Sequence, residues 1–405
     1  MGGNVRYRTR RAVEKVFLRF SAYAENRREM LKFKALRNCK ISTSGVGVLR
    51  FSLPRIPSYL EPVMATRDTI VIGASAGGVQ ALTKLVADFP ADLPAAVFVI
   101  LHVAPNLPSL LPEILARDSR LKVAHAKNGE AITWGNVYVA PPDHHLLIED
   151  QHVKIVHGPK ENLHRPSIDA LFRSAARWAG PRVIGVVLTG ARDDGTVGMR
   201  AVKRRGGLAI VQDPAEALFP SMPLSVMQDT KVDYSLPLRE IAPLLNVLSR
   251  ETADEGDYAV SDIELESRIA GQEMESEELI ASVDRLGKVS KLTCPDCHGA
   301  LWELDDDMLR YRCHVGHAFS AESLETGQTQ MLEIALWSAV RALEEQIILS
   351  KRIVERAHRS NHKRAATMFE KRAKEAEANS SVIRQILLSR EKEPAEDAIL
   401  QSGND

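Results

Sequence analysis

The chain has 405 residues, enough for two or three domains, and its 53 Lys and Arg residues balance its 53 Asp and Glu residues. The balanced charge argues against the strongly basic class of nucleic-acid-binding proteins. No apolar run reaches the roughly 18 residues of a membrane span, and Val16-Phe17-Leu18 is too short for a signal-peptide core. We therefore expect a cytoplasmic protein with no membrane insertion and no nucleic-acid partner.

Residues 1–63 are rich in Arg and Lys and contain few acids. Such a tract is usually solvated or disordered, although a helix pair around residues 12–34 or a basic arm would also fit it. Met64 runs straight into the first buried-strand pattern, as a natural start would. We therefore expect a disordered extension or an upstream extension of the reading frame. The sequence does not decide whether translation starts at Met1 or at Met64.

Strand and helix patterns alternate from Thr69 onward. Helical spacing of apolar residues, bounded by Pro, Gly or a capping residue such as Ser167, predicts helices over 79–89, 110–117, 167–179, 197–205 and 241–248. Short apolar runs predict strands that start at residues 69, 96, 137, 145, 154, 183 and 208. This order predicts an α/β domain over residues 64–250, a doubly wound, mostly parallel sheet with helices on both faces.

Three of these strands end in residues that can carry chemistry. Ser75 follows the first strand, His102 ends the second, and Asp194 follows the strand at 183–189. Parallel strands end on one edge of a sheet, so the three side chains are expected to meet there. A serine, a histidine and a carboxylate in contact form a nucleophile, a base and an orienting acid.

Each of these residues also has a plainer interpretation. The glycine-rich turn at residues 73–78 resembles a dinucleotide-binding loop, but Ser75 replaces the second glycine and the next strand ends in His102 instead of an acid. A lone histidine is usually a core residue, and Asp194 or Asp193 could simply cap the helix that follows. The joint placement on one edge favours the catalytic interpretation.

The C-terminal third of the chain has a different composition. Residues 251–290 are acidic and weakly apolar, which predicts a linker. Residues 320–405 are almost free of Gly and Pro until a polar tail and carry an apolar stripe at helical spacing, which predicts a helical hairpin or short coiled coil.

Between these segments, residues 291–319 contain Cys294-x-x-Cys297 and Cys313-x-x-x-His317, the spacing of a tetrahedral zinc site. The predicted ligands are Cys294, Cys297, Cys313 and His317, with His314 and His298 as competitors for the fourth position. A closed set of four ligands predicts structural zinc, while unligated thiols are the alternative. Cys39 stands apart, and the pattern is not a disulfide framework, which fits a reducing compartment.

Several motifs together resemble the chemotaxis protein-glutamate methylesterase family, CheB, over roughly residues 68–248. They are residues 71–78 around Ser75, Leu101-His102-Val103, residues 138–145, His164-Arg165-Pro166-Ser167-Ile168-Asp169, Leu188-Thr189-Gly190 with Asp193-Asp194-Gly195, and Gln212-Asp213 with Ser221-Met222-Pro223. The segment at 291–319 is similar to the zinc-ribbon-like module that follows some family members without a receiver domain.

The resemblance implies a cofactor-free enzyme that hydrolyses γ-glutamyl methyl esters on methylated chemoreceptors and can also deamidate receptor glutamines. It implies a triad of Ser75, His102 and Asp194, the last chosen over Asp193 because the family's acid directly precedes the glycine. It also implies an oxyanion site made by backbone N–H groups near Ala76 and the Ala191 loop.

Three departures from the family pattern bear on function. Residues 1–63 are too short for the usual receiver domain, so control by phosphorylation in cis is not expected. Ala191 and Arg192 stand where many receptor-acting members have methionine and glycine. The C-terminal region has no counterpart in the typical enzyme.

An alternative function is therefore a regulatory binding module that holds a methyltransferase or kinase partner. A nucleotide-binding domain is a third interpretation.

Overall fold

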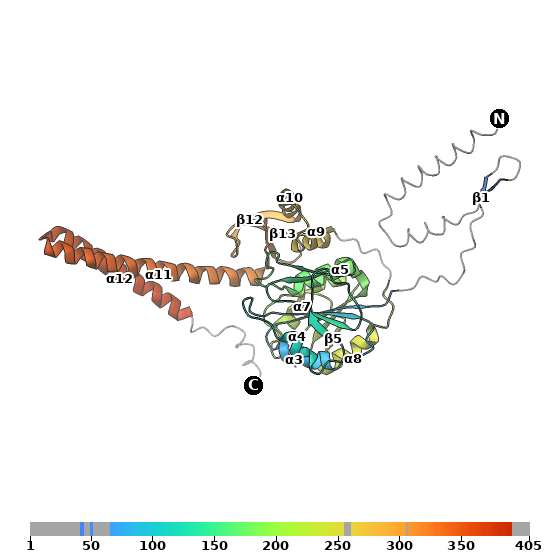
Figure 1. Ribbon diagram of the computed structural model, residues 1–405. Helices are drawn as coiled ribbons and strands as arrows, with labels where there is room; N and C mark the ends of the chain where they lie inside the picture. Colours follow the sequence, from blue (N-terminus) through green and yellow to red (C-terminus); the bar gives the residue numbers. More distant parts are fainter. Residues whose placement is uncertain (1–40, 44–48, 52–64, 255–260, 305–306, 391–405) are drawn as a thin grey trace, which may run out of the picture. The chain divides into compact units, whose positions relative to one another are not determined.

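The computed structural model describes residues 41–43, 49–51, 65–254, 261–304 and 307–390, coloured along the chain in Figure 1. The chain divides into two compact units, residues 1–63 and 64–405. In the first unit, β1 (Ile41–Thr43) and β2 (Leu49–Phe51) pair antiparallel. The other expectations for residues 1–64, including the helix pair, fall outside the described residues. Among the described residues, no helix is long and apolar enough to cross a membrane.

The second unit contains a seven-stranded sheet whose strands all run parallel, in the order β11-β10-β9-β3-β4-β6-β5. The strands are β3 (Thr69–Ala74), β4 (Ala96–Leu101), β5 (Lys122–His125), β6 (Asn136–Val139), β9 (Val183–Val187), β10 (Leu208–Gln212) and β11 (Tyr234–Leu236). The expected parallel α/β sheet is therefore confirmed. The strands expected at residues 145 and 154 are β7 (His145–Glu149) and β8 (His152–Val156), which pair with each other in a separate antiparallel hairpin outside this sheet.

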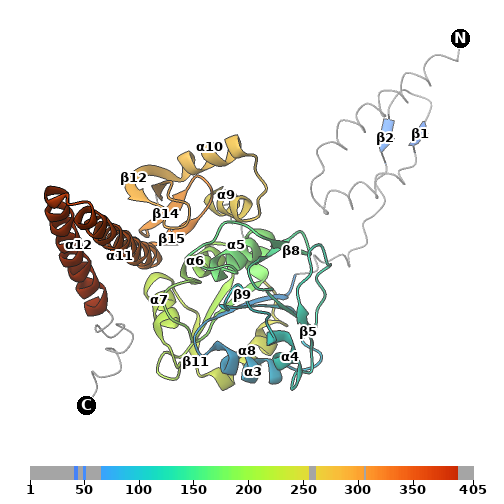
Figure 2. The same cartoon turned by 60° about the vertical axis from the view of Figure 1, so that its left-hand side comes forward.

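Helices cover both faces of the sheet (Figure 2). One face packs against α3 (Gly78–Ala87), α4 (Leu111–Ala116) and α8 (Leu238–Leu248). The opposite face packs against α5 (Ile168–Ala179), α6 (Thr196–Arg204) and α7 (Ser221–Asp229); the 3-10 turn η1 (Gly180–Arg182) leads from α5 into β9. Successive strand residues alternate between the two cores, as Ile70 and Val71 do, because side chains point to opposite faces of a pleated strand.

The segment expected to be an acidic linker contains α9 (Ser261–Ala270) and α10 (Ser276–Leu286). Ile263 and Ile269 of α9 are buried, and Glu264 and Glu273 form ion pairs with Arg177 of α5. The difference has a physical cause: the acidic composition that indicates a solvated linker is here matched by basic side chains of α5 and α6.

The segment that carries the predicted zinc ligands folds into a four-stranded antiparallel sheet. Its strands are β12 (Gly287–Thr293), β13 (Ala300–Leu304), β14 (Arg310–Cys313) and β15 (Ala318–Ser320). We refer to the described part of residues 261–320, from α9 to β15, as the C-terminal module. It is followed by α11 (Ala321–Arg359) and α12 (Lys363–Arg390), which pack against each other and are joined by the Lys351–Glu377 ion pair. This is the expected helical hairpin.

Candidate active site

Ser75 lies in a tight turn between β3 and α3, at the point where β3 is flanked by β4 on one side and β9 on the other. Its backbone N–H donates to Thr189 O at 3.1 Å, and the Thr189 hydroxyl donates to Ala76 O at 3.0 Å. Gly77 caps α3 with φ of 72°, a backbone conformation that favours glycine. The end of β9 therefore holds the serine turn in place.

His102 follows β4 and joins the serine to the acid. The Ser75 hydroxyl lies 3.2 Å from His102 Nδ1, and His102 Nε2 lies 2.9 Å from Asp194 Oδ2. Because an ionised carboxylate only accepts, Nε2 carries the proton and Nδ1 is free to accept the serine proton. The side chain of His102 is 7% exposed and that of Asp194 is 2% exposed, so the pair is shielded from solvent.

Asp194 is surrounded by hydrogen-bond donors. Its carboxylate accepts from Ile168 N at 2.7 Å, from the Ser167 hydroxyl at 3.0 Å and from Asn162 Nδ2 at 3.0 Å, besides His102. Burial acts to raise the pKa of Asp194, but the hydrogen bond and charge of His102 outweigh it and hold that pKa well below its ordinary value. Asp194 is thus kept ionised and orients the imidazole.

The interpretation of Asp194 as a cap of its own helix does not hold, because Gly195 occupies the N-cap position of α6 without a side-chain bond. Asp194 instead caps the start of α5, where its carboxylate accepts a hydrogen bond from Ile168 N–H. Asp169 in the first turn of α5 caps α6 in return, accepting from Gly195 N at 3.0 Å and Gly198 N at 2.6 Å. This reciprocal capping fixes Asp194 between two helices.

Comparison with known proteins shows the family of the sheet domain. Residues 70–245 match the family model described as CheB methylesterase. A putative protein-glutamate methylesterase/protein-glutamine glutaminase of Leptospira interrogans is 39% identical over 189 residues, which are 46% of this chain and 98% of the relative. The chain belongs to the CheB methylesterase family. The resemblance that the sequence motifs indicate is therefore confirmed.

A second relative is longer than the matched region. Protein-glutamate methylesterase/protein-glutamine glutaminase 2 of Methanosarcina mazei is 40% identical over 218 residues, which cover 50% of this chain and 59% of that protein. A crystal structure of the Thermotoga maritima CheB methylesterase catalytic domain is 34% identical, covers 45% of this chain and 98% of that chain, and gives a TM-score of 0.44. The residues that match the family model, 70–245, lie in the parallel-sheet domain, and the C-terminal module and hairpin lie outside them.

His164 stacks on the ring of His102, with centroids 3.7 Å apart and planes inclined by 9°. Burial and the neighbouring His102 lower the pKa of His164 to about 3, so it is neutral near pH 7. A neutral ring can stack on the base without opposing its protonation. Sequence reasoning placed His164 only within a family motif and gave it no role.

Gly190 lies directly against Ser75. A side chain at Gly190 would meet Met222 Sδ and would come within 2.9 Å of Ser75 Cβ, so only glycine fits there. Arg192, two residues on, has φ of 67°, a conformation that favours glycine. The loop that follows β9 thus approaches Ser75 closely at Gly190.

The predicted triad residues are brought together, and Asp194 rather than Asp193 contacts His102. Sequence reasoning missed three further polar residues of this site: Asn162 and Asp169, which surround Asp194, and the role of Ser167, whose hydroxyl binds Asp194 and forms no helix-capping hydrogen bond. Ser167 and Asp169 lie in a motif of the family, whereas no pattern in the sequence marks Asn162.

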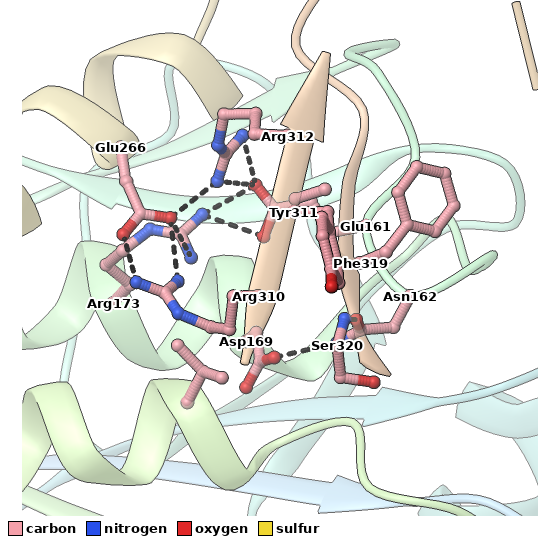
Figure 3. A pocket seen from close by; sticks show the side chains of 12 residues that line it. Glu161, Asn162, Asp169, Arg173, Glu266, Arg310, Tyr311, Arg312, Phe319 and Ser320 are labelled. Atoms are coloured by element: carbon pink, nitrogen blue, oxygen red, sulfur yellow. Dashed lines mark hydrogen bonds and ion pairs between the residues drawn. The ribbon is translucent and has the colours of Figure 1, made fainter. Parts of the chain in front are cut away.

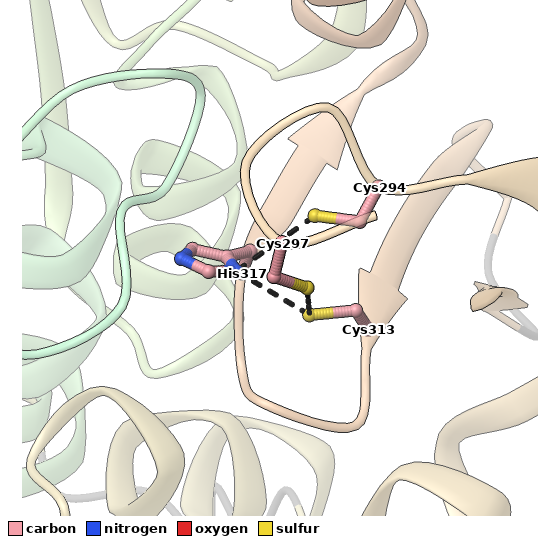
Figure 4. A group of neighbouring side chains, drawn as sticks. All are labelled: Cys294, Cys297, Cys313 and His317. Atoms are coloured by element: carbon pink, nitrogen blue, oxygen red, sulfur yellow. Dashed lines mark hydrogen bonds between the residues drawn. The ribbon is translucent and has the colours of Figure 1, made fainter. Parts of the chain in front are cut away.

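The four predicted metal ligands also meet (Figure 4). Cys297 Sγ and Cys313 Sγ are 3.7 Å apart, and His317 Nδ1 lies 3.7 Å from Cys294 Sγ and 3.5 Å from Cys313 Sγ. A zinc tetrahedron with Zn–S bonds of about 2.3 Å has edges of about 3.8 Å, so these separations fit zinc. His314 instead packs edge-on against Trp302, and the cluster contains neither His314 nor His298.

Proposed function

We propose that the protein is a serine hydrolase that demethylates γ-glutamyl methyl esters on methylated chemoreceptors. The observation that carries this proposal is the single imidazole that joins Ser75 Oγ to the buried carboxylate of Asp194. Membership of the CheB methylesterase family supports the substrate class. Family members that share this chemistry are also named glutaminases, so deamidation of receptor glutamines belongs to the same proposal.

In the first half-reaction, Ser75 Oγ gives its proton to His102 Nδ1 and attacks the ester carbonyl carbon. The resulting imidazolium is stabilised by Asp194 through Nε2–H. Collapse of the tetrahedral intermediate breaks the bond to the methoxy group, which takes the proton from His102 and leaves as methanol. The product of this step is an ester between Ser75 and the glutamyl side chain.

The oxyanion needs backbone donors close to Ser75. The N–H groups of Ser75 and Gly190 already donate to Thr189 O and Phe219 O. We therefore assign the oxyanion to N–H groups near Ala76 and in the loop at Ala191, at the positive end of α3. In the second half-reaction, His102 takes a proton from water, and the resulting hydroxide attacks the acyl carbon. The bond to Ser75 Oγ then breaks as Oγ takes the proton back from His102, and the glutamic acid product ionises to the carboxylate.

Zinc at Cys294, Cys297, Cys313 and His317 is part of this proposal as a structural ion. The one ligand atom that each residue offers lies within 4.8 Å of the other three, and Cys294 and Cys313 are buried, which is the donor set and spacing of a structural zinc site. The ion would hold β14 and the residues before β15 together, and all four ligands come from the protein, so it would take no part in ester hydrolysis.

The test is methanol release from methylated chemoreceptor membranes by the wild type, by Ser75→Ala and by Ser338→Ala. Ser338 is an exposed serine of α11 that serves as a matched control. Loss of the nucleophile should lower the rate by several orders of magnitude with an unchanged melting temperature, while Ser338→Ala keeps full activity. Equal release by Ser75→Ala and the wild type would refute the proposal.

A second function, binding of a methyltransferase or kinase partner, is favoured by apolar side chains that the hairpin exposes, such as Ile334 at 67% and Leu349 at 60%. It predicts stable co-purification of such a partner, lost when Ile334 and Leu349 are changed to Glu. It also predicts that Ser75→Ala leaves the signalling output of the pathway unchanged.

A further inference from the structure

The C-terminal module contacts the loop that supports the triad acid. Ala318 N donates to Lys160 O at 3.2 Å, and Asn162 N donates to Ala318 O at 2.8 Å. Ala318 directly follows the metal-cluster residue His317 and begins β15. Residues that are more than 150 positions apart in the sequence therefore pair through their backbones beside the active site.

Asn162 uses both ends of its side-chain amide in this contact. Its Oδ1 accepts from Ser320 N at 2.9 Å and from the Ser323 hydroxyl at 3.1 Å, at the start of α11. Its Nδ2 donates to Asp169 Oδ2 at 2.8 Å and to Asp194 Oδ1 at 3.0 Å. The residue is 5% exposed, so water does not compete for these bonds.

These partners fix the direction of the amide. The backbone N–H of Ser320 can only donate, so it requires the amide oxygen, and the ionised carboxylate of Asp194 can only accept, so it requires the amide nitrogen. A flipped amide would face Ser320 N with its own N–H group and would place its oxygen against Asp169 and Asp194. The start of α11 therefore decides which group Asn162 offers to the triad acid.

The amide nitrogen is placed where a donor is most needed. Asp169 and Asp194 are buried carboxylates that lie next to each other, and Asp169 has a pKa raised by burial and by the charge of Asp194. A single donor that binds one oxygen of each reduces their mutual repulsion. It also holds Asp194 in the orientation that receives His102 Nε2–H.

A buried ion network anchors the module to this loop (Figure 3). Glu161, the neighbour of Asn162, accepts from Arg173 of α5 at 2.6 Å and lies 3.4 Å from Arg312 of β14. Glu266 of α9 accepts from Arg312 at 2.6 Å and from Arg310 at 3.0 Å. The five side chains are at most 9% exposed, so the contact is a dry and specific one.

We propose that Asn162 is a positioning residue of the triad and that the C-terminal module, through Ser320, and the start of α11, through Ser323, set its amide. The module is then a structural part of the active site, and displacing it lowers the rate of the chemical step. This inference rests on the proposed serine-hydrolase chemistry. Asn162 is the residue through which the C-terminal module acts on that chemistry.

The test compares Asn162→Ala and Ser323→Ala with Ser338→Ala, a serine of the same helix that bonds only its own turn. For Asn162→Ala we expect kcat on the methyl ester to fall about 10- to 100-fold with KM nearly unchanged, because the base is misaligned while the substrate still binds. For Ser323→Ala, which keeps the Ser320 donor, we expect a fall of about three- to tenfold. Ser338→Ala should match the wild type.

The low-field proton resonance of His102 Nε2–H provides a readout that needs no substrate. It should shift or broaden in Asn162→Ala and stay in place in Ser338→Ala, with melting temperatures recorded for each variant. Wild-type kcat and resonance in both Asn162→Ala and Ser323→Ala would refute the inference and leave the proposed function intact. A protein with no ester turnover whose resonance changes in Asn162→Ala would refute the function and support the inference.

Discussion

The parallel-sheet domain and the C-terminal module are stabilised in different ways. The domain buries two large apolar layers, one on each face of its sheet, and confines its polar chemistry to the edge where Ser75 lies. The apolar cluster at the module's sheet is small and consists of Leu301, Tyr311, Phe319 and two cysteines, together with Leu324 of α11. Small folds of this kind usually need a metal or another support, so we expect the module to depend on its metal cluster and ion network.

The buried carboxylates of the two regions have different partners. Asp194 is buried against a histidine and the donors at the start of α5, and its loss would lower the rate of the proposed ester hydrolysis. Glu161 and Glu266 are buried to hold three arginines, and their loss would affect how the module attaches. Because Asn162 lies between the two sets, the module can influence the rate without contributing a triad residue.

Removal of the proposed zinc ion should have the largest effect on stability. A structural zinc ion contributes about 10 to 16 kcal/mol to small zinc domains, so His317→Ala or chelation should unfold the module while the sheet domain stays folded. Limited proteolysis should then cut first within residues 287–320, and bound zinc should fall below one ion per chain. His314→Ala is the matched control and should keep its zinc. A metal-free module that resists protease would contradict the expectation that the module depends on its metal cluster.

Loss of one buried carboxylate should have the next largest effect. Glu266→Gln removes the buried carboxylate that Arg310 and Arg312 share, while Arg312 keeps Glu161 at 3.4 Å, and this should lower the free energy of unfolding by about 3 to 5 kcal/mol. Glu264→Gln changes the same helix at a side chain that is 50% exposed, and its ion pair with Arg177 should be worth less than about 1 kcal/mol. Denaturant titration measures both variants. Equal effects would show that the network does not anchor the module.

Much of the sheet domain could be predicted from the sequence because its information is local. Buried parallel strands appear as short apolar runs, and their carboxyl ends share one edge, which brought Ser75, His102 and Asp194 together in the prediction. The spacing of Cys294, Cys297, Cys313 and His317 was likewise sufficient to predict their cluster.

The remaining features depend on pairing between distant segments. The sequence around Glu264 and Glu273 predicts a solvated linker. Only the structure shows that both side chains form ion pairs with Arg177. Asn162 has a polar side chain in a loop, and its role requires Ser320, which is 158 residues further along the chain. No periodicity or motif records such contacts, so neither the folded segment at 261–286 nor the support of Asp194 could be predicted.

The most direct test of the account is the reaction of the full chain with a fluorophosphonate, which modifies a serine only when a base activates it. The account predicts that Ser75 alone is modified in the wild type, as located by peptide mass spectrometry, and that His102→Ala slows this reaction by orders of magnitude. Modification at another serine, or equal rates in the wild type and His102→Ala, would contradict it.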